Sequence, residues 1–376
     1  MKTKKVLYFV LLFLLTLLCV GSVFKLYKSK KLGGWWDKEK RPVISVKNFL
    51  EGSFQQDFDI YLNRNSTYYN GLVRFHNQIN YSLFNATLNS SLFCGKEGVL
   101  YEKGHIYNAL YGQWTEKLPY FIEKSAKFAK IKDTLTKQGK DFIYIAAPGK
   151  GSLYPEYLPN HISHLRMNHS PQTTFLRQFD SLGVDYIDFD KYFIELRKTD
   201  NNPIFSKYGI HYTKYAAYKV IDSLSRYFEK KYPFMPKVVL DSMTKDYTEW
   251  ENENDIYKAA NLIFKHPKEE LTHPYFHYEQ RSDKHLKCVV IGDSFVWQLF
   301  YLNFFDKYFK DSQFWYYFNE VFYAGDGDKT TTIDKIDVID ELSKADVIMV
   351  LFTNGTTLDY DKGFTDTVYK HYFGDK

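Results

Sequence analysis

The segment KCVVIGDSFVWQL, residues 287–299, decides how this chain of 376 residues is organised. Its apolar, β-branched run CVVI predicts a strand that is buried on both faces. The run breaks at Gly292 and Asp293, and residues 295–309 then form an aromatic-rich stretch with the length of a helix. Ser294 is therefore expected at a sharp turn from strand to helix, with the first free N–H groups of the helix around it.

A serine in that position is suited to act as a nucleophile. The turn exposes its Oγ, and backbone donors lie where an oxyanion would form. Gly292 allows the backbone to turn tightly, and Asp293 stands beside the serine as a supporting residue. The alternative is that Asp293 and Ser294 only cap an ordinary core helix. A histidine partner would favour catalysis.

Among the eleven histidines, His211 is the candidate base. It lies in SKYGIHYT, residues 206–213, directly before a strongly amphipathic segment for which Thr213 is the expected N-cap. A histidine in a loop that leads into such a helix can project over the edge of a sheet. By default it would be a surface or capping group. Together with the Gly-Asp-Ser segment it predicts a Ser294–His211 pair.

The rest of the chain alternates between helix-like and strand-like segments. Helical patterns occupy residues 118–138, 171–182 and 213–232, and buried-strand patterns occupy residues 142–147, 184–189 and 346–352. This alternation predicts an α/β fold with a mostly parallel sheet covered on both faces. Ligands then belong at the carboxyl ends of the strands, where Pro148, Ser294 and Asn354 fall. Asn354 is a candidate oxyanion donor, or merely a turn residue before Gly355.

The amino terminus is predicted to lie outside this domain. Residues 6–24 are apolar almost throughout and long enough to cross a bilayer as a helix. Lysines precede and follow the run, so the positive-inside rule does not decide its orientation. A cleaved signal peptide is the alternative, but no small-residue cleavage site follows the run. We expect residues 1–31 to be an uncleaved single-pass anchor, residues 32–44 a juxtamembrane linker, and residues 45–376 one domain outside the membrane. Within that domain, residues 233–284 are polar and irregular and form an excursion from the sheet.

Charge and cysteine content exclude some classes of function. The formal net charge is +5, but residues 1–40 hold nine lysines and two acids, and the remaining 41 basic and 43 acidic residues nearly cancel. This balance argues against a nucleic-acid surface. Cys94 and Cys288 lie in apolar runs, so they could form one disulfide or remain two buried free thiols. No pattern of Cys and His has metal-site spacing, and no metal or cofactor is expected.

Several blocks of the sequence carry a resemblance to a known family. They are the helical lead FDIYLNRNSTYYNGLVRFHNQINYSLF (residues 58–84), GKEGVLY (95–101), APGKGSLYPEYLP (147–159), GIHYT (209–213) and the Ser294 segment. Gly-Asp-Ser after a strand is also the first signature block of the SGNH hydrolases. Over nearly all of residues 45–360 the chain resembles the alginate O-acetylation proteins of the AlgJ/AlgX type. The order histidine before serine is typical of that family.

This resemblance implies a fold, an activity and partners. The fold would be an SGNH-like three-layer sandwich in the bacterial periplasm, held by the anchor in the inner membrane. The activity would be acetyl transfer to a polysaccharide hydroxyl through Ser294 and His211, with an integral-membrane MBOAT-type acetyl-carrier protein as partner. A carbohydrate O-acetyl esterase would use the same residues. A polysaccharide-binding scaffold without catalysis is the third hypothesis.

The chain departs from the family pattern at one important position. Gly209 stands where the Asp-x-His block would place the carboxylate that orients the histidine. Asp188 and Asp190, at the end of the strand predicted over residues 184–189, are the nearest candidates for that role, and a backbone carbonyl is the alternative. Asp188 is equally expected as a helix cap. Tyr212 replaces the usual tryptophan and keeps an aromatic wall.

Overall fold

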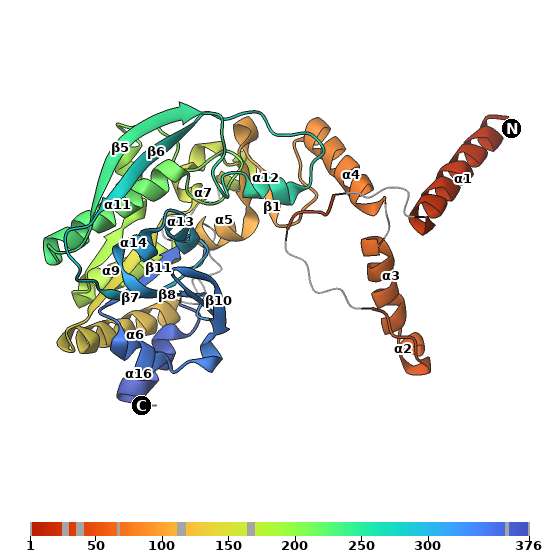
Figure 1. Cartoon of the computed structure of the whole chain (residues 1–376). Helices are drawn as coiled ribbons and strands as arrows, with labels where there is room; N and C mark the ends of the chain where they lie inside the picture. Colours follow the sequence, from red (N-terminus) through yellow and green to blue (C-terminus); the bar gives the residue numbers. More distant parts are fainter. Residues whose placement is uncertain are drawn as a thin grey trace. The chain divides into compact units, whose positions relative to one another are not determined.

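The computed structural model describes residues 2–24, 30–34, 41–65, 68–110, 118–163, 170–357 and 361–374 (Figure 1). The chain divides into two compact units. Unit 1 comprises Met1–Leu92 and Tyr257–His266, and unit 2 comprises Phe93–Ile256 and Pro267–Lys376. Part of the predicted linker, residues 35–40, and the predicted flanking lysines Lys25 and Lys28 lie outside the described residues.

Unit 1 is helical. Its elements are α1 (Lys2–Val23), α2 (Val46–Leu50), α3 (Ser53–Asn65) and α4 (Tyr69–Phe84). Helix α4 is tied to residues 257–266 by two buried amides. Asn77 Nδ2 donates to the carbonyl of Ala260 (2.9 Å), and Gln78 Oε1 accepts from the N–H of Ile263 (3.0 Å). These bonds explain why a segment so distant in sequence belongs to this unit.

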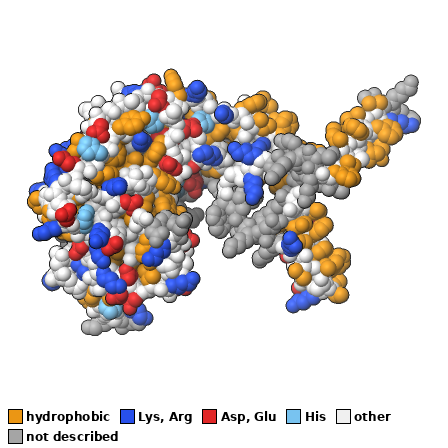
Figure 2. Space-filling model, in the orientation of Figure 1, with side chains coloured by type: hydrophobic (Ala, Val, Ile, Leu, Met, Phe, Trp, Pro, Cys, Tyr) orange, Lys and Arg blue, Asp and Glu red, His pale blue; other side chains and the backbone are white. Residues whose placement is uncertain are grey.

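Helix α1 contains the run that was predicted to cross a membrane. Most apolar side chains of residues 6–17 are exposed on it and appear as an orange surface in Figure 2. Within the part of the chain that the structure describes, no helix is both long and apolar enough for a membrane span. The helix itself is therefore present, but the predicted transmembrane span is not confirmed.

Unit 2 is built on a mostly parallel sheet, as predicted. Among the described residues the sheet has seven strands, in the order β10-β9-β8-β7-β11-β3-β4. Their bounds are β10 (Asp326–Thr332), β9 (Glu320–Tyr323), β8 (Lys310–Tyr316), β7 (Lys287–Gly292), β11 (Val347–Thr353), β3 (Asp141–Ala147) and β4 (Tyr186–Asp188). Strands β8 to β4 in that order are parallel, and β9 and β10 add an antiparallel edge. Val350 of β11 pairs with Ile291 on one side and Tyr144 on the other.

The three central strands are buried on both faces, which explains their unbroken apolar sequences. Along β7, Cys288 and Val290 face one hydrophobic core, and Val289 and Ile291 face the other. One core is covered by α10 (Phe189–Leu196), α11 (Lys214–Lys231), α13 (Val296–Tyr301) and α14 (Phe304–Tyr308). The opposite core is covered by α6 (Leu118–Lys137), α9 (Pro171–Leu182), α15 (Val338–Lys344) and α16 (Phe364–Phe373). Figure 1 shows α6 and α16 on one side of the sheet and α11 and α13 on the other.

Helix ends in unit 2 follow the expected capping chemistry. Ser170 caps α9 with a capping box, and Gly183 ends it in the left-handed region at φ 66°. Thr213 caps α11 by accepting from the N–H of Ala216. The aromatic segment after Ser294 differs from its prediction as one helix. Asn303 adopts φ 57°, which breaks the segment into α13 and α14.

The predicted excursion is more regular than its polar sequence indicates. It contains β5 (Lys237–Asp246) and β6 (Leu271–Glu279), which pair antiparallel outside the main sheet, and α12 (Asp255–Ala260) lies between them. The shorter elements of unit 2 are β1 (Leu92–Cys94), η1 (Lys96–Gly98), β2 (Leu100–Glu102), α5 (Lys103–Leu110), α7 (Lys150–Leu153), η3 (Pro155–Tyr157), α8 (Asn160–Ser163) and η4 (Ile333–Lys335). Cys94 and Cys288 are buried free thiols, so no disulfide joins them.

Candidate active site

Ser294 lies where β7 ends, at the turn that the sequence predicts. The turn is tight because a Cβ on Gly292 would come within 2.5 Å of the Leu351 carbonyl oxygen, so only glycine fits against β11. Asp293 is fully buried. Its Oδ2 accepts from the N–H and the Oγ1 of Thr353, each at 2.8 Å, and its Oδ1 accepts from the N–H of Phe295 at 3.0 Å. Asp293 therefore anchors the turn to β11 rather than facing a substrate.

Ser294 and His211 meet across this turn. Ser294 Oγ lies 2.8 Å from His211 Nε2, and His211 Nδ1 lies 2.5 Å from Asp255 Oδ2. The imidazole is partly buried and rests against the ring of Phe295, with ring centroids 4.9 Å apart. A hydroxyl, an imidazole and a carboxylate in this order form the arrangement that activates a serine nucleophile.

The carboxylate comes from Asp255, a residue that the sequence analysis did not single out. Asp255 also accepts the backbone N–H of Ile210 through Oδ1 (2.9 Å), so one side chain holds the histidine ring and its loop. Gly209 makes this possible. A Cβ there would come within 2.6 Å of the Glu253 carbonyl oxygen, so the absence of a side chain lets the segment that carries Asp255 approach. No spacing rule connects residues 209 and 255, so the sequence offered no signal.

The prediction that Asp188 orients His211 is wrong. The Asp188 side chain caps α10 by accepting the N–H of Lys191 at 3.0 Å, which is the alternative left open for it. Asp190 accepts from Ser152 Oγ at 2.8 Å. Asp188 is the last residue of β4 and Asp190 follows the strand, whereas the partner of His211 Nδ1 is Asp255.

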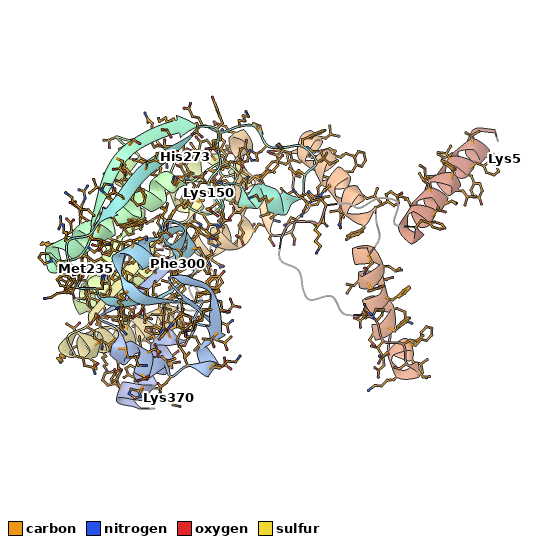
Figure 3. All side chains as sticks on the ribbon, viewed as in Figure 1. Lys5, Lys150, Met235, His273, Phe300 and Lys370 are labelled. Carbon is orange, nitrogen blue, oxygen red and sulfur yellow. The ribbon has the colours of Figure 1, made fainter. Side chains whose placement is uncertain are left out.

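Lys150 supports the histidine loop from beneath. This lysine is only 4% exposed, and its Nζ donates to the carbonyls of Leu100 (2.8 Å), Lys207 (2.9 Å) and Gly209 (3.0 Å). Burial lowers the pKa of Lys150 to about 7, and the nearby Glu269 and Asp255 carboxylates act in the opposite direction. Figure 3 labels Lys150 within the body of unit 2. Its bonds to Lys207 and Gly209 hold the backbone just before His211, and its bond to Leu100 ties that backbone to β2.

Two further side chains adjoin the site and were not predicted. Tyr317 begins the turn after β8, and its backbone N–H donates to the Gly292 carbonyl at 2.8 Å. Tyr317 and Phe318 have φ values of 49° and 50°, a costly conformation for bulky residues that is typical of functional sites. Burial and the Asp293 charge raise the pKa of the Tyr317 hydroxyl, against a smaller lowering by a hydrogen bond with the Ser294 side chain. The phenol therefore stays protonated as a donor beside the nucleophile.

His105, on α5, is the other unpredicted neighbour. Its ring stacks on Phe295 at 6.1 Å, and a Cβ on Gly355 would come within 2.4 Å of its Nδ1. Among the described residues Nδ1 has no hydrogen-bond partner. Burial lowers the pKa of His105, which keeps the ring neutral.

Asn354 lies at the same edge of the sheet but is engaged elsewhere. Its Nδ2 donates to Ser152 Oγ at 2.8 Å, and its Oδ1 has no hydrogen-bond partner among the described residues. Its role as an oxyanion donor stays a prediction. The residues with described positions include no group of three or more His, Cys, Asp or Glu side chains placed to hold a metal ion.

Half of the chain matches a known protein family. Residues 110–298 match the family described as "SGNH hydrolase-like domain, acetyltransferase AlgX". The chain belongs to this family. Residues 110–298 include Lys150, His211, Asp255 and Ser294, and the AlgX family's description makes the chain an acyltransferase of the SGNH type.

Solved structures similar to this AlgX-family chain include three from bacteria. The O-acetyltransferase domain of Pseudomonas putida AlgJ is 12% identical, covering 75% of this chain and 99% of that chain with a TM-score of 0.49. Pseudomonas aeruginosa AlgX is 11% identical, and the match covers 71% of this chain and 66% of that chain with a TM-score of 0.43. Bacillus cereus PatB1 is 11% identical, and the match covers 65% of this chain and 92% of that chain with a TM-score of 0.40. No curated protein matches the chain.

Proposed function

We propose that this chain is a polysaccharide O-acetyltransferase in which Ser294 carries the acetyl group and His211 moves the protons. The observation that carries the proposal is the 2.8 Å contact between Ser294 Oγ and His211 Nε2, with the Asp255 carboxylate 2.5 Å from Nδ1. The family supports the acetyl group, since its description names an acetyltransferase. The polysaccharide acceptor rests on the resemblance to alginate O-acetylation proteins.

In the first half-reaction Ser294 Oγ attacks the carbonyl carbon of an acetyl donor. Its proton passes to His211 Nε2, and Asp255 stabilises the imidazolium that forms. The N–H of Ser294 makes no hydrogen bond to the described residues and is available to the oxyanion, and the Tyr317 hydroxyl is a second donor. The bond to the leaving group then breaks, and His211 returns the proton to that group.

In the second half-reaction the acetyl-serine ester is the donor. An acceptor hydroxyl loses its proton to His211 Nε2 and attacks the acetyl carbonyl carbon, and Ser294 leaves and regains the proton from His211. The same residues would act if water replaced the sugar hydroxyl. The acceptor alone therefore separates a transferase from an esterase.

The scaffold hypothesis was motivated by Gly209, which left His211 without an acid. Asp255 supplies a carboxylate at the position that the hypothesis assumed to be empty. This favours catalysis over a binding protein without activity.

The test is direct acetylation of the serine. With p-nitrophenyl acetate we expect an adduct on the peptide containing Ser294, detected by mass spectrometry. Ser294→Ala should abolish it, and His211→Ala should slow its formation by about 10²- to 10⁴-fold. A folded protein that never acquires the adduct would contradict both enzymatic hypotheses. With an oligosaccharide present, a transferase acetylates the sugar, and an esterase releases only acetate.

We further propose that the domain is exported to the periplasm and held at the inner membrane through α1, with an MBOAT-type carrier as acetyl supplier. The exposed apolar surface of α1 supports membrane attachment, and the carrier rests on the resemblance alone. Carboxy-terminal fusions should be active as a periplasmic phosphatase and dark as a cytoplasmic fluorophore. The reverse pattern would overturn this location.

A further inference from the structure

Unit 2 contains a cavity of about 330 Å³ beside the loop that leads to His211. Two chain segments build most of its wall: the turn around η3 and residues 197–207. The side chains that matter for the argument are Tyr154, Tyr157, Arg197, Asn201, Asn202 and Lys207. Nothing in the catalytic mechanism uses this cavity.

Two aromatic rings, Phe205 and Phe295, connect the cavity wall to the catalytic histidine. Phe205 lines the cavity and forms an isolated antiparallel bridge with Tyr212. Its ring packs edge-on against Phe295 at 6.2 Å, and Phe295 lies against His211 at 4.9 Å. A molecule in the cavity is therefore close to the catalytic loop and contacts Phe205 rather than Ser294, which does not line the cavity.

The carboxylates in the wall are already satisfied by the protein. Asp200 accepts from the N–H of Asn202 at 2.8 Å and from the Tyr215 hydroxyl. Glu269 accepts from Ser206 Oγ at 2.8 Å and from the N–H of Lys207 at 2.9 Å. These acids therefore organise the wall and leave few acceptors for a ligand.

Three side chains in the wall, those of Arg197, Asn201 and Tyr157, still have donor groups available to a ligand. The Arg197 guanidinium stacks on the Tyr154 ring at 4.2 Å and pairs with Glu156 at 2.6 Å through one nitrogen, so its other N–H groups remain available. Among the described residues, the side-chain amide of Asn201 and the hydroxyl of Tyr157 have no hydrogen-bond partner. Such a wall suits a ligand that offers many oxygen acceptors and an apolar face to an aromatic ring.

We propose that this cavity binds one sugar unit of the acceptor polymer, adjacent to the unit that receives the acetyl group. The proposal rests on the polysaccharide acetyltransferase function above and adds a second subsite to it. Ser294 does not line the cavity, so the bound unit is not the one acetylated, and its role is to hold the chain while another unit reaches the acetyl-serine. A second binding point converts the encounter with the reacting unit into an intramolecular event.

The experiment compares acceptors of different length. Transfer from acetylated Ser294 is measured with a monosaccharide and with longer oligosaccharides, in separate glucose-based and uronate-based arms. For the full chain, kcat/KM should rise with acceptor length in at least one arm. Asn201→Ala and Tyr157→Phe should each raise KM for the long acceptor by roughly three- to tenfold, since each removes one hydrogen bond, with kcat unchanged.

A matched control uses Lys198→Ala, which lies beside this wall but pairs on the surface with Glu195 at 2.7 Å. It should leave every acceptor unaffected. Ser294 acetylation by p-nitrophenyl acetate reports separately on the catalytic site, so its loss would count against the proposed function. If Ser294 is acetylated but acceptor length has no effect in either arm, or neither variant changes KM, the subsite is refuted.

Discussion

His211 Nδ1 lies 2.5 Å from Asp255 Oδ2, although the two residues are 44 positions apart in the chain. The resemblance noted for residues 209–213 implies an Asp-x-His block with its carboxylate two residues before the histidine, and this chain has Gly209 there. Space left by that glycine is filled by the backbone of Asn252 and Glu253. The acid has therefore moved to another segment while its contact with the imidazole is kept.

Asp255→Asn should lower kcat for acetyl transfer by about 10⁴-fold without unfolding the protein, because the histidine loses the partner that fixes its tautomer. Steady-state kinetics together with circular dichroism would measure both effects. Asp188→Ala is the matched control and should only lower the free energy of unfolding by about 1 kcal/mol, as loss of a helix cap. If Asp188→Ala instead abolished activity and Asp255→Asn left it unchanged, Asp188 would be the orienting acid.

Gly209→Ala should lower both stability and activity. The new Cβ would lie within 2.6 Å of the Glu253 carbonyl oxygen, so the segment carrying Asp255 must move away. We expect a loss of about 1–3 kcal/mol in the free energy of unfolding, measured by urea denaturation, and a fall in kcat. Gly71→Ala is the control, because a Cβ there meets nothing within 4 Å. If Gly209→Ala kept the wild-type kcat, the close approach of the Asp255 segment to residue 209 would not be needed for activity.

Lys150→Met should weaken the histidine loop and change how stability depends on pH. Burial holds the pKa of Lys150 at about 7, below its ordinary value of 10.5, so the unfolded chain binds the extra proton between these values. Its contribution to stability is therefore present above 10.5 and is lost as the pH falls through 7.

In the wild type this group makes stability rise from pH 7 to 10.5, and Lys150→Met should remove that slope. The variant should also lose about 1–3 kcal/mol for each carbonyl left without a donor, and its kcat should fall. Urea denaturation across this pH range tests the slope. Lys198 is an exposed lysine, so Lys198→Met should keep the rise of stability between pH 7 and 10.5. An unchanged slope in Lys150→Met would contradict the lowered pKa of Lys150.

Tyr317→Phe should lower kcat by about 10²-fold with little change in KM, because the ring remains while the donor beside Ser294 is lost. The rate of Ser294 acetylation by p-nitrophenyl acetate measures this effect. Tyr316→Phe provides the neighbouring control, since the Tyr316 ring packs against Trp297 and Phe314 rather than Ser294. Equal effects of the two substitutions would point to a packing role.

Local sequence by itself determined four strands of the main sheet (β3, β4, β7 and β11), helices that cover them, and the strand–helix turn that carries Ser294. The buried strands could be predicted because both of their faces are covered, which makes their sequences continuously apolar. Ser294 and His211 could be identified because each lies next to a local signal, a strand–helix turn in one case and a helix N-cap in the other. Asn303, which divides the predicted helix after Ser294, shows the limit of such patterns.

Only the tertiary structure decided which acid completes the site, which groups surround it and how the excursion is built. Asp255 contacts His211, Tyr317 lies beside Ser294, and Lys150 holds the backbone before His211, each from a separate segment. These contacts depend on approaches of the backbone that no sequence spacing records. Strands β5 and β6 escaped prediction because they pair outside the main sheet and many of their residues are polar, although Val238, Phe276 and Tyr278 pack against the core. Contacts between distant segments follow from packing, and a lone glycine at residue 209 did not reveal which segment would take its place.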